Sequence, residues 1–242
     1  MFTIPADKDP MGKAILDYYQ YGKAERLRVF SSQFEEDEIP VKQLFRNWDE
    51  MPLLERKALS LAKGRILDVG AGSGCHSIYL QESGLDVVSI DVSPLSVQVM
   101  QKRGVKDARL TNLFDERFCE TFDTIYMLMN GSGIIGQLEK MPLFFQRMKY
   151  LLNPGGTIFM DSSDLRYLFE DEDGSFVINL ADKYYGEIDF YMQYKNIIGE
   201  PFNWLYLDFQ TLSYYASECG FCTELIQEGK HYDYLASLRL KE

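Results

Sequence analysis

A loop with three glycines at alternate positions is the part of the sequence with the clearest chemical meaning. Residues 66–76 read Ile-Leu-Asp-Val-Gly-Ala-Gly-Ser-Gly-Cys-His. Because glycine has no Cβ, such a backbone lets a ligand approach closely, and a helix that follows it offers N–H groups at its start. Nicotinamide-binding loops read G-x-G-x-x-G, and here Cys75 stands where their third glycine would be. The carboxylate of Asp68 suits a ligand with an ammonium group and fits a pyrophosphate poorly.

Short apolar runs alternate with amphipathic stretches on both sides of this loop. We expect strands at 65–69, 86–90, 108–110, 122–129 and 157–160, and helices at 77–83, 94–103 and 142–152. Strands separated by helices of this length imply parallel β-α-β crossovers and a doubly wound sheet. A helix at 208–219 and a hairpin formed by 221–227 and 232–240 are expected to complete the fold.

The glycine loop resembles motif I of the class I S-adenosylmethionine-dependent methyltransferases, in which an acid precedes G-x-G-x-G. Three further features follow in the family's order: Asp91 ends the second strand, Phe-Asp at 122–123 opens the fourth, and Leu-Leu-Asn-Pro-Gly-Gly at 151–156 precedes the fifth. The terminal hairpin matches the family's sixth and seventh strands. The resemblance implies an α/β, doubly wound Rossmann-like seven-stranded sheet that ends in an antiparallel hairpin, with S-adenosyl-L-methionine as cofactor.

The resemblance also implies a role for individual residues. Asp68 is expected to act on the cofactor's amino group, Asp91 to bind both ribose hydroxyls, and Asn112 to meet the adenine amine. Asn112 stands where the family often has Asp, and its side chain offers both an acceptor and a donor. The remaining expected contacts come from the loop and from the strand ends near the adenine and the methionine tail: Gly70, Ala71, Gly72, Gly74, Val92, Leu113, Phe114, Asn130 and Gly131. Arg46 is the hypothesised clamp on the cofactor carboxylate.

Each of these assignments has a structural alternative that the sequence leaves open. The glycines can form a plain tight turn, and Asp91 can cap a helix, although Ser93 already suits that task. Asn112 can be an ordinary turn residue, 130–133 a loop without a ligand, and Arg46 a surface residue.

Histidine and cysteine residues give no clear catalytic or metal-binding signal. His76 follows the glycine loop, where a packing role is favoured over that of a general base, and His231 is expected in an exposed turn. The C-x-x-C at 219–222 has no second ligand pair, so we expect Gly220 to end a helix and Phe221 to open a strand. We expect no metal site and assign no catalytic residue.

Two segments outside the core are candidates for the acceptor site. Residues 1–64 are helical in pattern, with helices expected at 11–21, 41–46 and 52–63, and they are expected to form a cap. A cofactor-binding core at 65–164, an insertion at 165–207 and the final helix and hairpin at 208–242 are expected to follow. The insertion contains an alternating stretch at 186–195 that suits an antiparallel strand. It is rich in aromatic residues: Tyr167, Phe169, Phe176, Tyr184, Tyr185, Phe190, Tyr191, Tyr194, Phe202, Trp204 and Tyr206. They can line a pocket, or simply pack the added strands.

The composition excludes several other classes of protein. The chain has 242 residues, with 37 acidic against 25 basic side chains and a formal charge of −12, which argues against nucleic acid and anionic membranes as partners. No apolar run approaches the length of a membrane span, and the first residues lack a signal-peptide core, so a cytoplasmic location is expected. Apolar residues make up 46%, which is typical of a globular protein.

The function expected from these observations is methyl transfer to an unidentified small molecule. A sulfonium cofactor is already an activated electrophile, so the protein mainly has to hold a nucleophile in line with the methyl group. The alternative is a protein that binds S-adenosylmethionine for regulation or as a scaffold, without methyl transfer. A nicotinamide oxidoreductase is a distant third because of the mismatch at Cys75.

Overall fold

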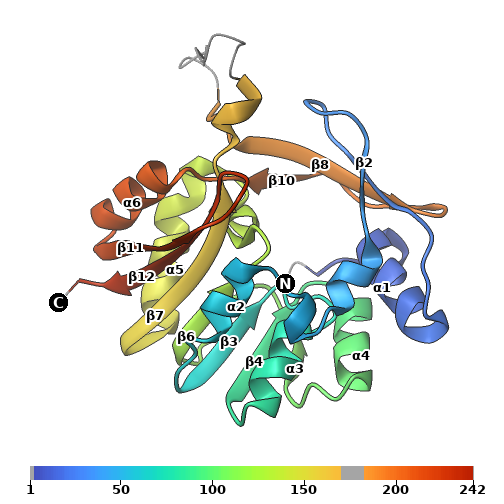
Figure 1. Ribbon diagram of the computed structural model, residues 1–242, viewed down its shortest axis with the longest axis horizontal. Coiled ribbons are helices and arrows are strands. Elements are labelled where there is room, and N and C mark those ends of the chain that lie inside the picture. Colours follow the sequence, from blue (N-terminus) through green and yellow to red (C-terminus); the bar gives the residue numbers. More distant parts are fainter. Residues whose placement is uncertain (1–2, 170–182, 242) are drawn as a thin grey trace.

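A seven-stranded sheet forms the centre of the protein, for which the computed structural model describes residues 3–169 and 183–241 (Figure 1). The strand order is β11-β12-β7-β6-β3-β4-β5, with five parallel strands and the antiparallel hairpin β11-β12 at one edge. The strands are β3 (Arg65–Val69), β4 (Asp86–Asp91), β5 (Ala108–Leu110), β6 (Phe122–Met127), β7 (Leu152–Ser163), β11 (Phe221–Glu228) and β12 (Asp233–Leu240). This arrangement confirms the fold class predicted from the sequence.

Helices cover both faces of this sheet. They are α2 (Leu53–Leu59), α3 (Cys75–Glu82), α4 (Pro94–Lys102), α5 (Met141–Leu151) and α6 (Phe209–Glu218). Neighbouring residues of a strand enter opposite cores: Leu67 packs in the cluster with α5 and α6, whereas Ile66 packs in the cluster with α2 and α3. None of the helices within the described residues combines the length and the apolar character needed to cross a membrane.

The helix boundaries follow local capping signals. The Ser93 side chain accepts a hydrogen bond from the N–H of Ser96 at the start of α4, and Pro94 occupies the first turn. Gly220 follows the end of α6 with φ +80° and Phe221 opens β11, which confirms the structural interpretation of the C-x-x-C segment. These signals act within a few residues, so they can be recognised in the sequence.

A second, smaller sheet corrects the prediction that residues 1–64 contain only helices. It has five strands, β1 (Leu27–Phe30), β2 (Asp37–Ile39), β8 (Glu187–Tyr194), β9 (Ile197–Ile198) and β10 (Phe202–Leu205), in the order β10-β8-β1-β2 with β9 beside β8. Each of β1 and β2 is too short to show a pattern, and β1 obtains its long partner β8 only through tertiary folding. The predicted antiparallel strand at 186–195 is confirmed.

The first part of the chain and the insertion therefore build one layer together (Figure 1). The sheet carries apolar residues such as Leu27 and Tyr194 on the face toward α1 (Pro10–Tyr21), where both side chains are fully buried. α1 in turn packs on α4 of the core. Two helical predictions are partly corrected: 41–46 is a short 3₁₀ turn, Val41–Phe45, and the helix expected at 52–63 spans only Leu53–Leu59.

Candidate active site

The glycine loop follows β3 at the carboxyl edge of the parallel strands, where open α/β sheets bind ligands. The N–H groups of Gly70 and Ala71 both donate to the carbonyl oxygen of Ile90, at 2.9 and 3.1 Å, and the N–H of Gly72 donates to Asp91 Oδ2 at 2.8 Å. The N–H groups of these three loop residues are all bound to atoms of β4. The loop is therefore not a cradle for phosphate, in agreement with the preference for a cationic ligand.

Two of the glycines are required for different physical reasons. Gly72 has φ +55°, with no neighbouring atom within 4 Å of where a Cβ would stand, so its backbone conformation is what requires glycine. Gly74 also has a positive φ, +81°, and a Cβ there would in addition come within 2.9 Å of Val105 and 3.0 Å of Met100, so glycine allows the loop to pack closely on the segment around α4.

Asp91 is the acidic group nearest to the glycine loop on the side of β4. Its Oδ2 accepts from the N–H of Gly72 and its Oδ1 from the N–H of Ser93, both at 2.8 Å. Each oxygen keeps a further lone pair that can accept a hydrogen bond from a hydroxyl group. Burial raises the pKa of Asp91 to about 6, although the two backbone hydrogen bonds favour the carboxylate. Ser93, and not Asp91, accepts the capping bond of α4.

A pocket opens beside Asp91 between the ends of the first three parallel strands in chain order. Its walls come from Val69, Gly70, Ile90, Asp91, Val92, Thr111, Asn112, Leu113, Phe114 and Ile134. Most of these side chains are apolar, and Asp91 is the one carboxylate among them. The Asn112 side-chain oxygen accepts from the N–H of Phe114 at 2.8 Å, so Asn112 forms a turn while its NH₂ group remains a donor. A flat heterocycle joined to a diol would match this combination of walls.

Asp68 lies beneath the glycine loop and is only 2% exposed. The hydroxyl of Ser77 on α3 donates to its Oδ2 at 2.5 Å. Burial raises the pKa of this carboxyl group. Asp68 thus connects the end of β3 to α3, and its expected action on the cofactor's amino group stays a prediction.

The turn after β6 contains Asn130 and Gly131, which the sequence predicted to lie near the methionine tail. Met129 and Asn130 both have a positive φ, 68° and 56°, which is uncommon for residues other than glycine. The N–H groups of Met129 and Gly131 both donate to the Asp161 carboxylate at 3.1 Å. Asp161 is in β7 and is 9% exposed, and burial raises its pKa to about 7.

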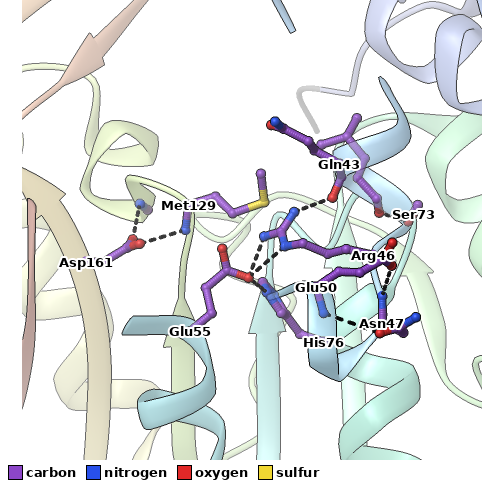
Figure 2. Close-up of polar contacts among 11 residues, drawn as sticks. Gln43, Arg46, Asn47, Glu50, Glu55, Ser73, His76, Met129 and Asp161 are labelled. Carbon is purple, nitrogen blue, oxygen red and sulfur yellow. Dashed lines mark hydrogen bonds and ion pairs between the residues drawn. The ribbon is translucent and has the colours of Figure 1, made fainter. Parts of the chain in front are cut away.

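Arg46 is neither a surface residue nor an isolated charge. Its Nε donates to Glu55 Oε2 at 3.1 Å, a second nitrogen also binds that oxygen, and a third donates to the carbonyl of Gln43. His76 Nε2 contacts the same Glu55 oxygen at 2.7 Å. Figure 2 shows this cluster of Arg46, Glu55 and His76, with the side chain of Met129 extending toward it from the side of Asp161.

The three charged side chains of this cluster are all buried and alter each other's protonation. Burial disfavours the Glu55 carboxylate, but His76 and Arg46 outweigh this effect and hold the pKa of Glu55 below its usual value. Burial likewise disfavours the imidazolium of His76, but Cys75 and Glu55 raise its pKa well above the usual value. The cluster therefore contains two cationic groups around one carboxylate, and although burial disfavours the thiolate of the neighbouring Cys75, His76 lowers the pKa of that thiol. The Arg46 guanidinium is the part of the cluster best suited to bind an anionic group.

The smaller sheet meets the site through Trp204 of β10. A Cβ at Gly133, in the segment after the Asn130 turn, would lie 1.8 Å from the indole, so the ring packs directly on that backbone. Phe202 packs edge to face on Trp204, with ring centroids 6.0 Å apart, and Phe190 lies 6.2 Å from Phe202. Part of the aromatic cluster predicted from the sequence thus adjoins the site, whereas Phe176 lies outside the described residues.

Sequence reasoning missed two residues of this region, Glu55 and Asp161. Asp161 carried a usable signal, because it directly follows the predicted strand 157–160 just as Asp91 directly follows the predicted strand 86–90. Glu55 carried none, since it is one charge among several in a short helix and only folding brings it to Arg46 and His76.

The comparison with protein families decides what this arrangement is. A sequence model described as a methyltransferase domain matches residues 38–217, well over half of the chain. The chain belongs to the class I S-adenosylmethionine-dependent methyltransferases. This methyltransferase uses S-adenosylmethionine as its cofactor, as the sequence predicted.

Similar proteins support the same assignment. A crystal structure of an S-adenosylmethionine-dependent methyltransferase from Bacteroides fragilis, in complex with S-adenosylhomocysteine, has 70% sequence identity and a TM-score of 0.95, covering 99% of this chain and 98% of that one. An uncharacterized methyltransferase of Staphylococcus carnosus is 24% identical over 189 residues, 78% of this chain and 84% of the relative.

A third relative is similar over a shorter stretch. The cypemycin N-terminal methyltransferase of a Streptomyces species is 30% identical over 102 residues, and the chain spans only 42% of that relative's length. The match covers 41% of this chain, so it contributes to the family assignment and not to the identity of the acceptor. None of these comparisons supports the alternative of a cofactor-binding protein without methyl transfer.

Proposed function

We propose that this methyltransferase transfers the cofactor's methyl group to a small molecule by direct in-line displacement. One observation carries the proposal: Asp91 in its apolar pocket and the cationic cluster of Arg46, Glu55 and His76 lie around one glycine loop. A ligand that has a nucleoside at one end and an amino acid at the other would satisfy both regions. The cofactor supplies a methyl group already activated by the sulfonium.

The nucleoside end of the cofactor fits the pocket beside Asp91. The carboxylate accepts the two ribose hydroxyl groups, because its oxygens each retain a lone pair after binding the backbone N–H groups. Val92, Leu113 and Phe114 provide apolar surface for the adenine. The NH₂ group of Asn112 donates to a ring nitrogen, while its oxygen is already shared with the N–H of Phe114.

The amino-acid end fits the cationic cluster. Arg46 has five N–H groups, and three are used by its bonds to Glu55 and Gln43, which leaves two to bind the cofactor carboxylate. His76 adds a second positive charge, and Glu55 holds both cations in place. Gly70, Gly72 and the Asn130 turn border the methionine chain between the two ends.

The acceptor enters from the side of the smaller sheet, where Trp204 and Phe202 form an apolar wall next to the segment of Gly133. Such a wall excludes water and restricts the acceptor to orientations in which its nucleophile lines up with the methyl group, an effect of roughly several kcal/mol. A general base is needed only if the nucleophile carries a proton at neutral pH.

Two measurements, made one after the other, test this proposal. Calorimetric titration with S-adenosylhomocysteine should show binding, and transfer of labelled methyl groups should then be assayed on a panel of amines, phenols, carboxylic acids and short peptides. Peptides with a free N-terminus belong in the panel because one relative is named an N-terminal methyltransferase. Binding without turnover on any acceptor would favour the regulatory or scaffold alternative, and absence of binding would contradict both.

The expected absence of nucleic-acid and membrane partners stays a prediction from the charge of the chain. A formal charge of −12 opposes association with RNA, DNA and anionic membranes, and we expect none of them to bind tightly. Submicromolar RNA binding at physiological salt would contradict this. A cytoplasmic location is likewise carried forward as a prediction.

A further inference from the structure

Three consecutive residues at the end of β7 hold the turn that follows β6. The Asp161 carboxylate accepts from the N–H groups of Met129 and Gly131, and the Ser163 hydroxyl donates to the Asn130 side-chain oxygen at 2.8 Å. Between them, Ser162 accepts at 2.7 Å from the hydroxyl of Ser132 in the segment that follows the turn. The same piece of strand therefore contacts every residue from 129 to 132.

The conformation that these bonds hold is intrinsically unfavourable. Met129 and Asn130 both have a positive φ, which costs a side chain such as that of Met129 about 1–2 kcal/mol and an asparagine less. Such a turn persists only if surrounding groups determine it. Asp161 does so by offering one oxygen to the N–H of Met129 and the other to the N–H of Gly131.

The direction of these N–H groups also sets the direction of the carbonyl groups. β6 lies between β7 and β3, and the N–H of Met129 points to Asp161 on β7. Because a trans peptide holds its N–H and C=O antiparallel, the carbonyl of Leu128 points away from the Asp161 carboxylate. Ser163 meanwhile binds the oxygen of Asn130, which leaves the amide NH₂ of Asn130 available as a donor.

We infer that Asp161 is a positioning residue, which fixes the 129–131 turn so that it binds the amino-acid part of S-adenosylmethionine. The inference rests on the proposed function, because it takes the methionine tail to lie between Gly70 and this turn. Asp161 acts through the backbone. Replacing it by Asn would leave one oxygen as acceptor and place an NH₂ group against the second N–H donor, so the turn would lose its enforced shape.

The charge of Asp161 makes this role dependent on pH. Burial raises its pKa to about 7. The ionisable groups that face it are Glu55 on α2, His76 on α3 and Tyr234 on β12. Their pKa values are shifted away from neutrality, downward for Glu55 and upward for His76 and Tyr234, so their charges stay constant near pH 7. Protonation of Asp161 itself removes an acceptor from the turn.

The test compares Asp161→Asn with Asp164→Asn, which changes a carboxylate three residues away that binds Arg166 and Tyr185 and not the turn. The ligands are S-adenosylhomocysteine and 5′-methylthioadenosine, which lacks the amino acid, titrated calorimetrically at about pH 8 and about pH 6.5. We expect Asp161→Asn to weaken S-adenosylhomocysteine about tenfold at the higher pH and 5′-methylthioadenosine less than about twofold. The control Asp164→Asn should bind both ligands as the wild type does. The affinity of the wild type for S-adenosylhomocysteine should differ more between the two pH values than the affinity of Asp161→Asn.

A merely structural role would weaken both ligands equally, or would lower thermal stability without changing affinity, and either result would overturn the inference. If Asp161→Asn does not fold, Ser163→Ala removes only the bond to Asn130 and should weaken S-adenosylhomocysteine about threefold, with 5′-methylthioadenosine unchanged. Unchanged affinity for S-adenosylhomocysteine in Ser163→Ala would then contradict the inference that this turn binds the amino-acid part of the ligand. Failure of the wild type to bind S-adenosylhomocysteine would instead contradict the proposed function.

Discussion

The ribose side and the amino-acid side of the glycine loop are built in different ways. On the ribose side a single carboxylate, Asp91, is held by the N–H groups of Gly72 and Ser93. On the amino-acid side the charged groups come from four separate parts of the chain: Arg46 before α2, Glu55 in α2, His76 in α3 and Asp161 in β7.

This difference shows how the two ends depend on the rest of the fold. The ribose site needs little beyond the register of β3 and β4, because adjacent strand ends bring Gly72 and Asp91 together. The amino-acid site needs α2, α3 and β7 to pack correctly, and its buried charges are stable only in each other's presence. Substitutions on the ribose side should therefore act mainly on ligand binding. Substitutions on the amino-acid side should act on both ligand binding and the stability of the fold.

The largest effect is expected for Asp91→Ala. Loss of two hydrogen bonds from the ribose should weaken both S-adenosylhomocysteine and 5′-methylthioadenosine by about one to three orders of magnitude. Thermal stability should change little, because Ser93 still caps α4. Calorimetric titration measures the affinities, with Asp86→Ala at the opposite, exposed end of β4 as the control. S-adenosylhomocysteine affinity within about threefold of wild type would mean that the ribose is held elsewhere.

Arg46→Met tests the other side of the comparison. It should weaken S-adenosylhomocysteine by about tenfold or more while leaving 5′-methylthioadenosine nearly unchanged, because only the former has a carboxylate. Thermal unfolding should also reveal a stability loss, since Glu55 loses a buried partner, and Arg46→Met combined with Glu55→Gln should recover part of it. If Arg46→Met weakened S-adenosylhomocysteine and 5′-methylthioadenosine equally, Arg46 would not act on the amino-acid part of the ligand alone, which would contradict the proposed distinction between the ribose side and the amino-acid side.

The pH dependence should separate stability from binding. The folded pKa values of Asp91 and Asp161, about 6 and about 7, exceed the unfolded value of about 3.9. The folded state therefore binds more protons, and these two groups contribute stability that is lost as the pH rises through 6 to 7. Ribose binding needs the Asp91 carboxylate, so affinity should change in the opposite sense.

Between about pH 8 and pH 6 we therefore expect the melting temperature of the ligand-free protein to rise and the affinity for 5′-methylthioadenosine to fall by a few fold. Scanning calorimetry and titration over the same buffers measure both quantities. In Asp91→Asn the pH dependence of 5′-methylthioadenosine binding should largely disappear. A ligand affinity that rises on acidification would contradict the role of Asp91.

The smallest effect is expected in the first residues of the chain. The N–H of Ile4 donates to the carbonyl of Val92, next to Asp91, and the Asp9 carboxylate accepts from the hydroxyl of Ser93. Hydrogen exchange of residues 4–21 should therefore slow when S-adenosylhomocysteine binds. Unchanged exchange there, together with protection of the glycine loop, would mean that this segment does not respond to the cofactor.

Local signals predicted much of the core and of the ribose side. The glycine spacing, the acid at the end of β4, the Ser93 cap and the terminal hairpin are all confirmed as structural features. The strand β1 was missed because four residues, Leu27–Phe30, are too few to show a pattern without their partner β8. The bonds from the N–H groups of Gly70, Ala71 and Gly72 to β4 were not predicted, because they join residues about 20 positions apart in the sequence.

By itself, then, the sequence determined the elements that depend on neighbours along the chain: the glycine turn, the helix ends, and the order of strands that makes a doubly wound sheet. Only the tertiary structure decided that Arg46 binds Glu55 with His76, that Asp161 shapes the Asn130 turn, and that β1 joins β8. The physical reason is that a buried charge or a short strand is stabilised by partners distant in sequence, and no local pattern records which partners those are.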